Sequence, residues 1–213
     1  TGVQTCALPI CPDRLPAETN MLLMWTAAIS QSHPQPQVVT SVPEIRNDID
    51  KIILVIDESI RPDILHQVSG PIIKERPAID YGEAAATANC SSETQALLRW
   101  GLDRDRLEAN ACDPRMTPYI WGFAKKAGYH TVVIEGQTGK TPRCHFNPVE
   151  LGYVDEWLAM PRNLETDMLI ADELEKRLKN RQREFIYVTK IGAHFPYEKR
   201  YPRGYIAEDA TKL

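Results

Sequence analysis

Residues 51–59 read Lys-Ile-Ile-Leu-Val-Ile-Asp-Glu-Ser, and this stretch decides the fold class. After Lys51 the run is apolar and rich in β-branched side chains. It is too short for a helix and typical of a strand that is buried on both faces of a parallel sheet. The run ends in two carboxylates, Asp57 and Glu58. Because ligands of open parallel sheets bind beyond the carboxyl ends of the strands, residues that directly follow a strand are the first candidates for a functional site.

The same strand pattern returns twice downstream, each time after a helical pattern. Residues 118–127 predict a helix that closes at Gly128, and a strand follows at 130–134. Residues 164–180 predict a second helix with a basic last turn, and a strand follows at 185–189. Alternation of helices and strands predicts an α/β fold with a doubly wound, mostly parallel sheet and helices on both of its faces.

The chain divides into three parts. Residues 1–10 resemble a translated sequencing adapter and are left out of the fold argument. Residues 11–47 carry several prolines and predict a linker or juxtamembrane segment, whereas residues 48–213 form the domain. A short strand is expected at 79–81. The apolar stretch at 21–29 is far below the roughly 20 residues that cross a bilayer, so any membrane anchor is expected upstream.

Composition narrows the classes of function. The 213 residues are 43% hydrophobic, enough for one buried core, and the net charge of -4 leaves no basic surface for nucleic acid. One of the five cysteines lies in the adapter-like segment. The other four are compatible with two disulfides but lack the C-x2-C spacing of a structural zinc site, and they are Cys11, Cys90, Cys112 and Cys144.

Glu58 is the first candidate residue, because a carboxylate at a strand end can supply an oxygen ligand to a divalent cation. The alternative is a helix start, in which Asp57 or Ser59 caps the helix and Glu58 interacts with its dipole. Thr94 is the second candidate. It lies where hydroxyls gather at a helix start, so that its oxygen could attack a phosphate held by the helix N-terminus. A capping box formed by Ser92 and Gln95 would explain the same sequence.

Two further strand-end segments carry candidate substrate contacts. His194 follows the strand at 185–189, where an imidazole could hold a phosphate oxygen, although a structural histidine is the more common case. Gln137 and Lys140 follow the strand at 130–134, and Lys140 could face an anionic substrate or simply solvent. The Gly-Lys-Thr at 139–141 is not a P-loop, because the required first glycine is missing.

Over residues 51–205 these segments resemble, in order and spacing, the bacterial phosphoethanolamine transferases, a sulfatase-like branch of the alkaline-phosphatase superfamily. The family has Gly-Glu-Thr after its first strand where this chain has Asp-Glu-Ser at 57–59. It has Cys-Gly-Thr-x-Thr where this chain has Cys-Ser-Ser-Glu-Thr at 90–94. It then has an Asn- and Lys-bearing loop, similar to 135–140, and a Gly-x-His-x-Pro motif, similar to 192–196.

The resemblance implies roles for five residues. Thr94 would be the catalytic nucleophile and, together with Glu58, a ligand of Zn²⁺. His194, Gln137 and Lys140 would contact substrate. The implied reaction moves phosphoethanolamine from phosphatidylethanolamine, through a covalent threonine intermediate, to a lipid A or glycan acceptor. The implied location is the bacterial inner membrane, with the catalytic domain in the periplasm, where such a reaction modifies lipopolysaccharide.

The departures from the family pattern leave alternatives open. Asp57 and Ser91 stand where the family has glycine, and the family's Asp-His metal motif is expected downstream of Leu213. Residues 48–213 are therefore expected to be the N-terminal part of the catalytic domain, incomplete at its C-terminus and inactive alone. A formylglycine sulfatase is disfavoured, because Cys90 lacks the C-x-P-x-R context. A sulfatase-like phosphodiester hydrolase, a phosphoglycerol transferase and a non-catalytic α/β binding module remain alternatives.

Overall fold

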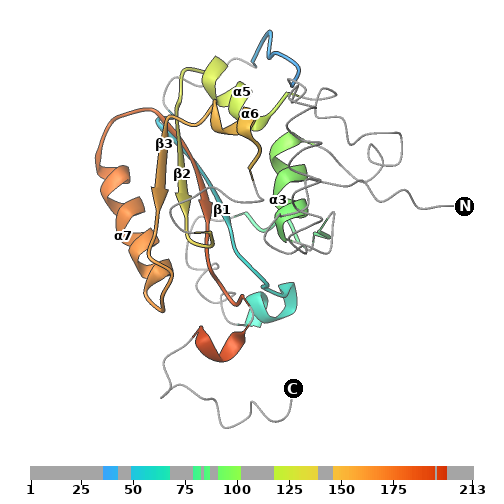
Figure 1. Ribbon diagram of the computed structural model, residues 1–213, viewed down its shortest axis with the longest axis vertical. Helices are drawn as coiled ribbons and strands as arrows, with labels where there is room; N and C mark the ends of the chain where they lie inside the picture. Colours follow the sequence, from blue (N-terminus) through green and yellow to red (C-terminus); the bar gives the residue numbers. More distant parts are fainter. Residues whose placement is uncertain are drawn as a thin grey trace, which may run out of the picture.

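A four-stranded parallel sheet forms the centre of the protein (Figure 1). The computed structural model describes residues 36–42, 49–67, 79–82, 84–86, 91–101, 118–138, 146–194 and 196–200. The strand order is β1-β4-β2-β3, and every pairing is parallel. The strands are β1 (Lys51–Ile56), β2 (His130–Glu135), β3 (Glu156–Ala159) and β4 (Glu184–Thr189). The predicted α/β fold with a parallel sheet is confirmed.

Helices cover both faces of this sheet, as predicted for a doubly wound fold (Figure 1). Helix α7 packs on one face, and helices α3, α5 and α6 lie on the other. The helical elements are α3 (Ser91–Trp100), α5 (Ile120–Lys126), α6 (Pro148–Leu151), α7 (Thr166–Lys179) and the short 3-10 helix η3 (Tyr197–Lys199). Residues 62–67 are also helical. Among the described residues, none of the helices has the length and apolar character that a bilayer crossing requires.

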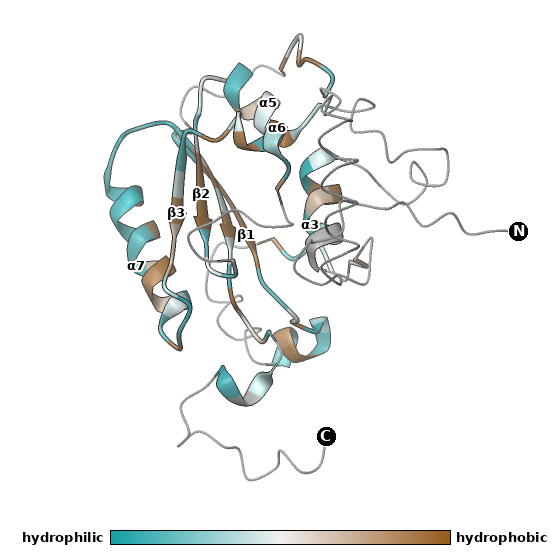
Figure 2. Ribbon diagram, viewed as in Figure 1, coloured by the Kyte–Doolittle hydropathy of each residue, from teal (hydrophilic) through white to brown (hydrophobic). Residues whose placement is uncertain are grey.

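Alternate residues of each central strand point to opposite faces, so the two faces have separate hydrophobic cores. One core contains Ile134, Ile186 and Val188 against Ile170 of α7. The larger core, on the α3 side, is aromatic and is built from Trp100, Tyr119, Trp121, Phe146, Phe185 and Tyr187. Figure 2 shows the apolar strands between more polar outer helix surfaces. Strands β2 and β4 are buried on both faces, which explains their continuous apolar runs. For β1 the prediction of burial on both faces was wrong: among the described residues β1 lies at an edge of the sheet, and its Ile52 and Val55 are 39% and 45% exposed.

A charged pair lies inside the aromatic core. Arg99 of α3 and Glu150 of α6 are both fully buried, and their side chains are joined by bonds of 2.7 Å and 3.3 Å. The Arg99 guanidinium also lies 4.0 Å from the centre of the Phe146 ring. Burial alone would lower the pKa of Arg99, but the neighbouring Glu150 and Tyr187 raise it, so the guanidinium remains charged. The pair joins α3 to α6 in the absence of solvent.

One further local prediction was wrong, and two short elements were not predicted. Residues 79–82 form no strand, because Asp80 accepts the Gly82 N–H at 2.8 Å and makes a turn in which Gly82 has a φ of 80°. Strand β3 and helix α6 were not predicted. Each has only four residues, and α6 depends on a capping box between Asn147 and Glu150. Elements this short carry no recognisable hydrophobic period.

Candidate functional site

The segments that follow β1, β2 and β4 meet at the carboxyl edge of the sheet. Lys190, after β4, donates to Asp57, after β1, with 2.6 Å between Nζ and Oδ2. Gln137, after β2, donates from Nε2 to the Lys190 carbonyl at 2.7 Å. Asp57 therefore forms an ion pair where the family has glycine. The three segments that were singled out by their strand-end position lie within one hydrogen-bonded cluster.

Glu58 lies at the centre of this cluster and is only 9% exposed. Its Oε1 accepts hydrogen bonds from Ser91 at 2.6 Å and from Ser59 at 3.1 Å, and its Oε2 accepts one from Gln137 at 3.3 Å. The Glu58 carboxylate therefore points toward the start of α3 and the segment after β2. This orientation favours a role in the cluster over an interaction with the helical turn at 62–67.

Thr94 lies in the first turn of α3 and is half-buried. Residues three and four apart share one side of a helix, which places Ser91 beside both Thr94 and Gln95. Ser91 contacts Glu58, and Gln95 donates from Nε2 to Gln137 Oε1 at 3.4 Å. The helix side that carries Thr94 thus faces the Glu58 cluster.

The capping box of Ser92 and Gln95 that the sequence suggests requires Ser92 to be the N-cap of α3. Helix α3 already begins at Ser91, so Ser92 lies inside the helix and is not its cap. Gln95 is 2% exposed, and its Oε1 has no hydrogen-bond partner among the described residues. Its amide group is directed toward Gln137 instead. Tertiary contacts at the sheet edge therefore outweigh the local capping preference.

His194 follows a tight turn packed against Glu58. Gly192 has a φ of 49°, and a Cβ there would lie 2.6 Å from Asp57 Oδ1 and 2.7 Å from the Glu58 carbonyl oxygen, so only glycine fits. The Ala193 N–H donates to that same carbonyl at 3.1 Å. The backbone of the Gly-x-His segment is thereby fixed beside Glu58. His194 is half-buried. Lys140 lies outside the described residues.

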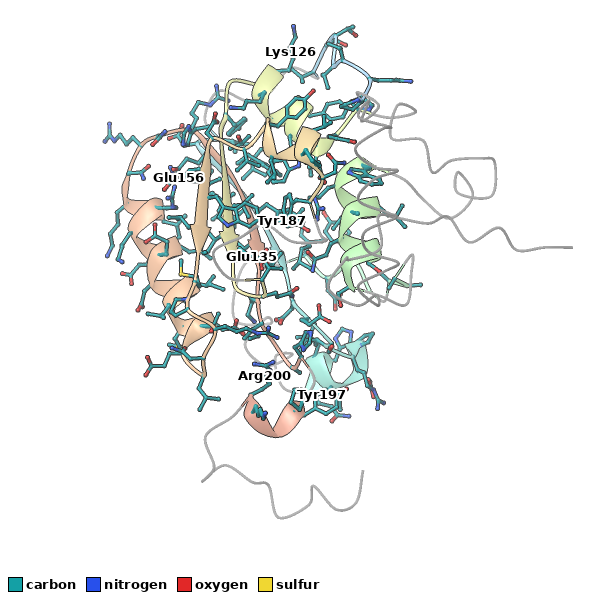
Figure 3. All side chains as sticks on the ribbon, in the orientation of Figure 1. Lys126, Glu135, Glu156, Tyr187, Tyr197 and Arg200 are labelled. Atoms are coloured by element: carbon teal, nitrogen blue, oxygen red, sulfur yellow. The ribbon has the colours of Figure 1, made fainter. Side chains whose placement is uncertain are left out.

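Glu135, the last residue of β2, was not singled out from the sequence. Its Oε1 accepts the N–H groups of Gln137 at 2.6 Å and Thr138 at 3.1 Å, so it shapes the segment that carries Gln137. Figure 3 shows Glu135 near Tyr187 at the centre of the molecule. The side chain is fully buried, and this burial raises the pKa of Glu135. Its position at a strand end was a usable signal, because that criterion had selected Glu58.

Glu135→Gln is expected to stabilise the protein more at neutral pH than near pH 4. When folding raises the pKa of a carboxyl group, the group favours the folded state most at pH values below its unfolded pKa, about 4.3. This contribution is lost as the pH rises through the folded pKa. Glutamine carries no charge at either pH, and its carbonyl oxygen can still accept both N–H groups. Urea unfolding at both pH values checks this, with exposed Glu175→Gln as the control. A stability difference between variant and wild type that does not grow with pH contradicts it.

The residues at this edge fit part of a zinc site. A buried carboxylate with donors on both oxygens is a suitable ligand, and Thr94 lies on the helix side that faces it. Within the described residues, no group of three or more His, Cys, Asp or Glu side chains is arranged to hold a metal ion. The remaining ligands would have to come from other residues.

Solved structures of two other proteins have the same fold as this chain. The C-terminal periplasmic domain of EcEptC from Escherichia coli, in complex with zinc, superposes with a TM-score of 0.60 at 18% identity, covering 80% of this chain and 51% of that one. The lipooligosaccharide phosphoethanolamine transferase EptA from Neisseria meningitidis, an integral membrane protein, gives 0.57 at 14% identity, covering 88% and 37%. This chain has the phosphoethanolamine transferase fold. It spans about half of the EptC domain.

Sequence comparison adds nothing to this fold assignment, since no protein-family model and no curated protein sequence matches the chain. The superpositions, with TM-scores of 0.57–0.60, establish the fold, whereas identities of 14–18% leave the activity to be argued from the residues. The resemblance stated from the motifs agrees with the fold. Among the described residues of those motifs, Glu58, Ser91 and Gln137 contact one another through Glu58 at the carboxyl edge of the sheet.

Proposed function

We propose that the protein is a zinc-dependent phosphoethanolamine transferase that uses Thr94 as its nucleophile. The observation that supports this most directly is the 2.6 Å bond between Ser91 and Glu58, which joins the β1 end to the start of α3. A candidate ligand and a candidate nucleophile, 36 positions apart in the sequence, are thereby held at one edge of the sheet. That edge is where open parallel sheets bind their ligands.

In the proposed reaction, the Thr94 oxygen attacks the phosphorus of phosphatidylethanolamine. The bond from phosphorus to the diacylglycerol oxygen breaks, diacylglycerol leaves with the proton that Thr94 loses, and phosphoethanolamine remains on Thr94. A phosphate or hydroxyl oxygen of a lipid A or glycan acceptor then attacks the phosphorus, the bond from phosphorus to the Thr94 oxygen breaks, and Thr94 regains a proton from the acceptor or from solvent. Zinc, when bound, supplies positive charge that favours loss of the hydroxyl proton.

The chain's own residues would position the groups for this reaction. Glu58 would hold the metal, and the first turn of α3 would direct N–H groups toward the phosphate. His194, Gln137 and Lys140 would contact the phosphoryl group and its substituent, where hydrogen-bond donors stabilise developing negative charge. Both substrates would be reached in the periplasm, from a domain that is anchored in the inner membrane through a segment upstream.

The test is detection of the covalent intermediate. The full-length protein is incubated with phosphatidylethanolamine, quenched in acid and digested, and mass spectrometry locates the modified residue. Phosphoethanolamine on Thr94 in the wild type, and its loss in Thr94→Ala, are expected. A Thr94→Ala protein that still forms the adduct contradicts the assignment. Phosphoglycerol on Thr94 with phosphatidylglycerol as donor would identify a different donor on the same site.

A further inference from the structure

The hydroxyl of Ser91 has no counterpart in the family pattern, which has glycine at this position. In this chain the Ser91 Oγ donates to Glu58 Oε1 at 2.6 Å, the shortest of the three hydrogen bonds on that carboxylate. A hydrogen bond to an ionised oxygen is shorter and stronger than one between neutral groups. A glycine at position 91 has no hydroxyl, so this hydrogen bond to Glu58 Oε1 would be left to solvent.

We propose that Ser91 is a positioning residue, which holds the Glu58 carboxylate in the orientation that binds zinc. This inference rests on the proposed function and extends it to Ser91, a position at which the family motif has glycine. Outer-shell hydrogen bonds of this kind fix ligand orientation and typically change metal affinity by about 10–100-fold.

The number of donors around Glu58 supports this role. A carboxylate has about four lone-pair positions on its two oxygens. Among the described residues, Ser91 and Ser59 donate to Oε1, and Gln137 donates to Oε2. Three positions are thus taken, and roughly one remains on Oε2, enough for a single bond to a cation. The donors therefore select one oxygen of Glu58 for the metal.

The location of Ser91 adds a second effect. It is the first residue of α3, and Thr94 follows it by one helical turn. A bond from Ser91 to Glu58 therefore fixes the start of α3 relative to the β1 end, and with it the separation of the proposed ligand and nucleophile. Ser59, the other hydroxyl on Oε1, belongs to the same segment as Glu58 and cannot fix this separation.

The competing explanation is that Ser91 only adds stability to the helix start. Three variants of the full-length protein distinguish the two. Ser91→Ala removes the hydroxyl, and Ser91→Thr keeps it. Thr131→Val removes a different buried hydroxyl, which donates to the Tyr153 carbonyl at 2.6 Å near the opposite end of β2. The last variant is the matched control for loss of a hydrogen bond without a change at the sheet edge.

Zinc affinity is measured by competition with a coloured chelator, alongside urea unfolding of the zinc-free protein. Ser91→Ala is expected to weaken zinc binding by about 10–100-fold, whereas Ser91→Thr and Thr131→Val keep the wild-type affinity. Equal affinities in Ser91→Ala and wild type would overturn the positioning role even if Ser91→Ala lowered stability. A wild-type protein that binds no zinc would instead overturn the proposed function.

Discussion

Replacing Glu150 with alanine is expected to lower the free energy of unfolding by about 3–5 kcal/mol, because the change leaves a fully buried guanidinium without its anion. Arg99 is 0% exposed. Among the described residues, its other close contacts are the Tyr187 hydroxyl at 3.4 Å and the faces of two aromatic rings, none of which carries a full negative charge. Glu150 also accepts from Trp121 at 3.3 Å, so its removal takes this acceptor from the buried indole N–H as well as from the guanidinium.

The same substitution removes half of the capping box at the start of α6. Glu150 Oε2 accepts the Asn147 N–H at 3.2 Å, and loss of a capping interaction costs about 1 kcal/mol. A double variant separates this effect from the charge. Arg99→Met with Glu150→Met removes both charges, and buried pairs replaced in this way by apolar residues are often close to neutral in stability. The double variant is therefore expected to be more stable than Glu150→Ala.

Urea unfolding measures these differences, with an exposed ion pair as the control. Lys179 and Glu175 form an i,i+4 pair on α7 with side chains 71% and 67% exposed. Glu175→Ala is expected to cost no more than about 0.5 kcal/mol. A Glu150→Ala variant that loses no more than Glu175→Ala would show that the Arg99 pair does not hold α3 in place.

The sheet could be predicted from the sequence because its strands are short, largely apolar runs, such as 52–56 and 185–189. Runs of this length are typical of strands in a parallel sheet, although in the structure only β2 and β4 are buried on both faces. Helix α7 was predicted within two residues, from 164–180 to Thr166–Lys179. The strand order β1-β4-β2-β3 could not be predicted, because it depends on long-range pairings such as that of β1 with β4, whose residues are 133 positions apart.

The site was predicted in outline and missed in detail for a similar reason. Strand-end position selected Glu58, His194 and the segment that carries Gln137 without any contact being known, and the family resemblance then selected Gln137 within its segment. The contacts of Ser91 with Glu58 and of Lys190 with Asp57 join residues 33 and 133 positions apart, and no spacing rule indicates them. The burial of Arg99 could not be predicted from the sequence, since a charged residue near a helix end is normally solvated.

Glu58→Gln is expected to abolish stabilisation by zinc while leaving the zinc-free protein almost unchanged. The amide has the shape of the carboxylate but no charge, so it keeps most hydrogen bonds and loses the anionic ligand. The zinc-free free energy of unfolding is expected to stay within about 1 kcal/mol of wild type.

Zinc raises the stability of any protein that binds it only when folded, by about 2.7 kcal/mol at 100 times Kd. The wild type should show this increase in urea unfolding, and Glu58→Gln should not. Asp57→Asn is the matched control: it neutralises the adjacent carboxylate, which is engaged by Lys190, and should retain the increase. If Glu58→Gln were stabilised by zinc as strongly as Asp57→Asn, the metal would be bound elsewhere. The contacts of Ser91 and Gln137 with Glu58 would then serve only to join α3 to the sheet.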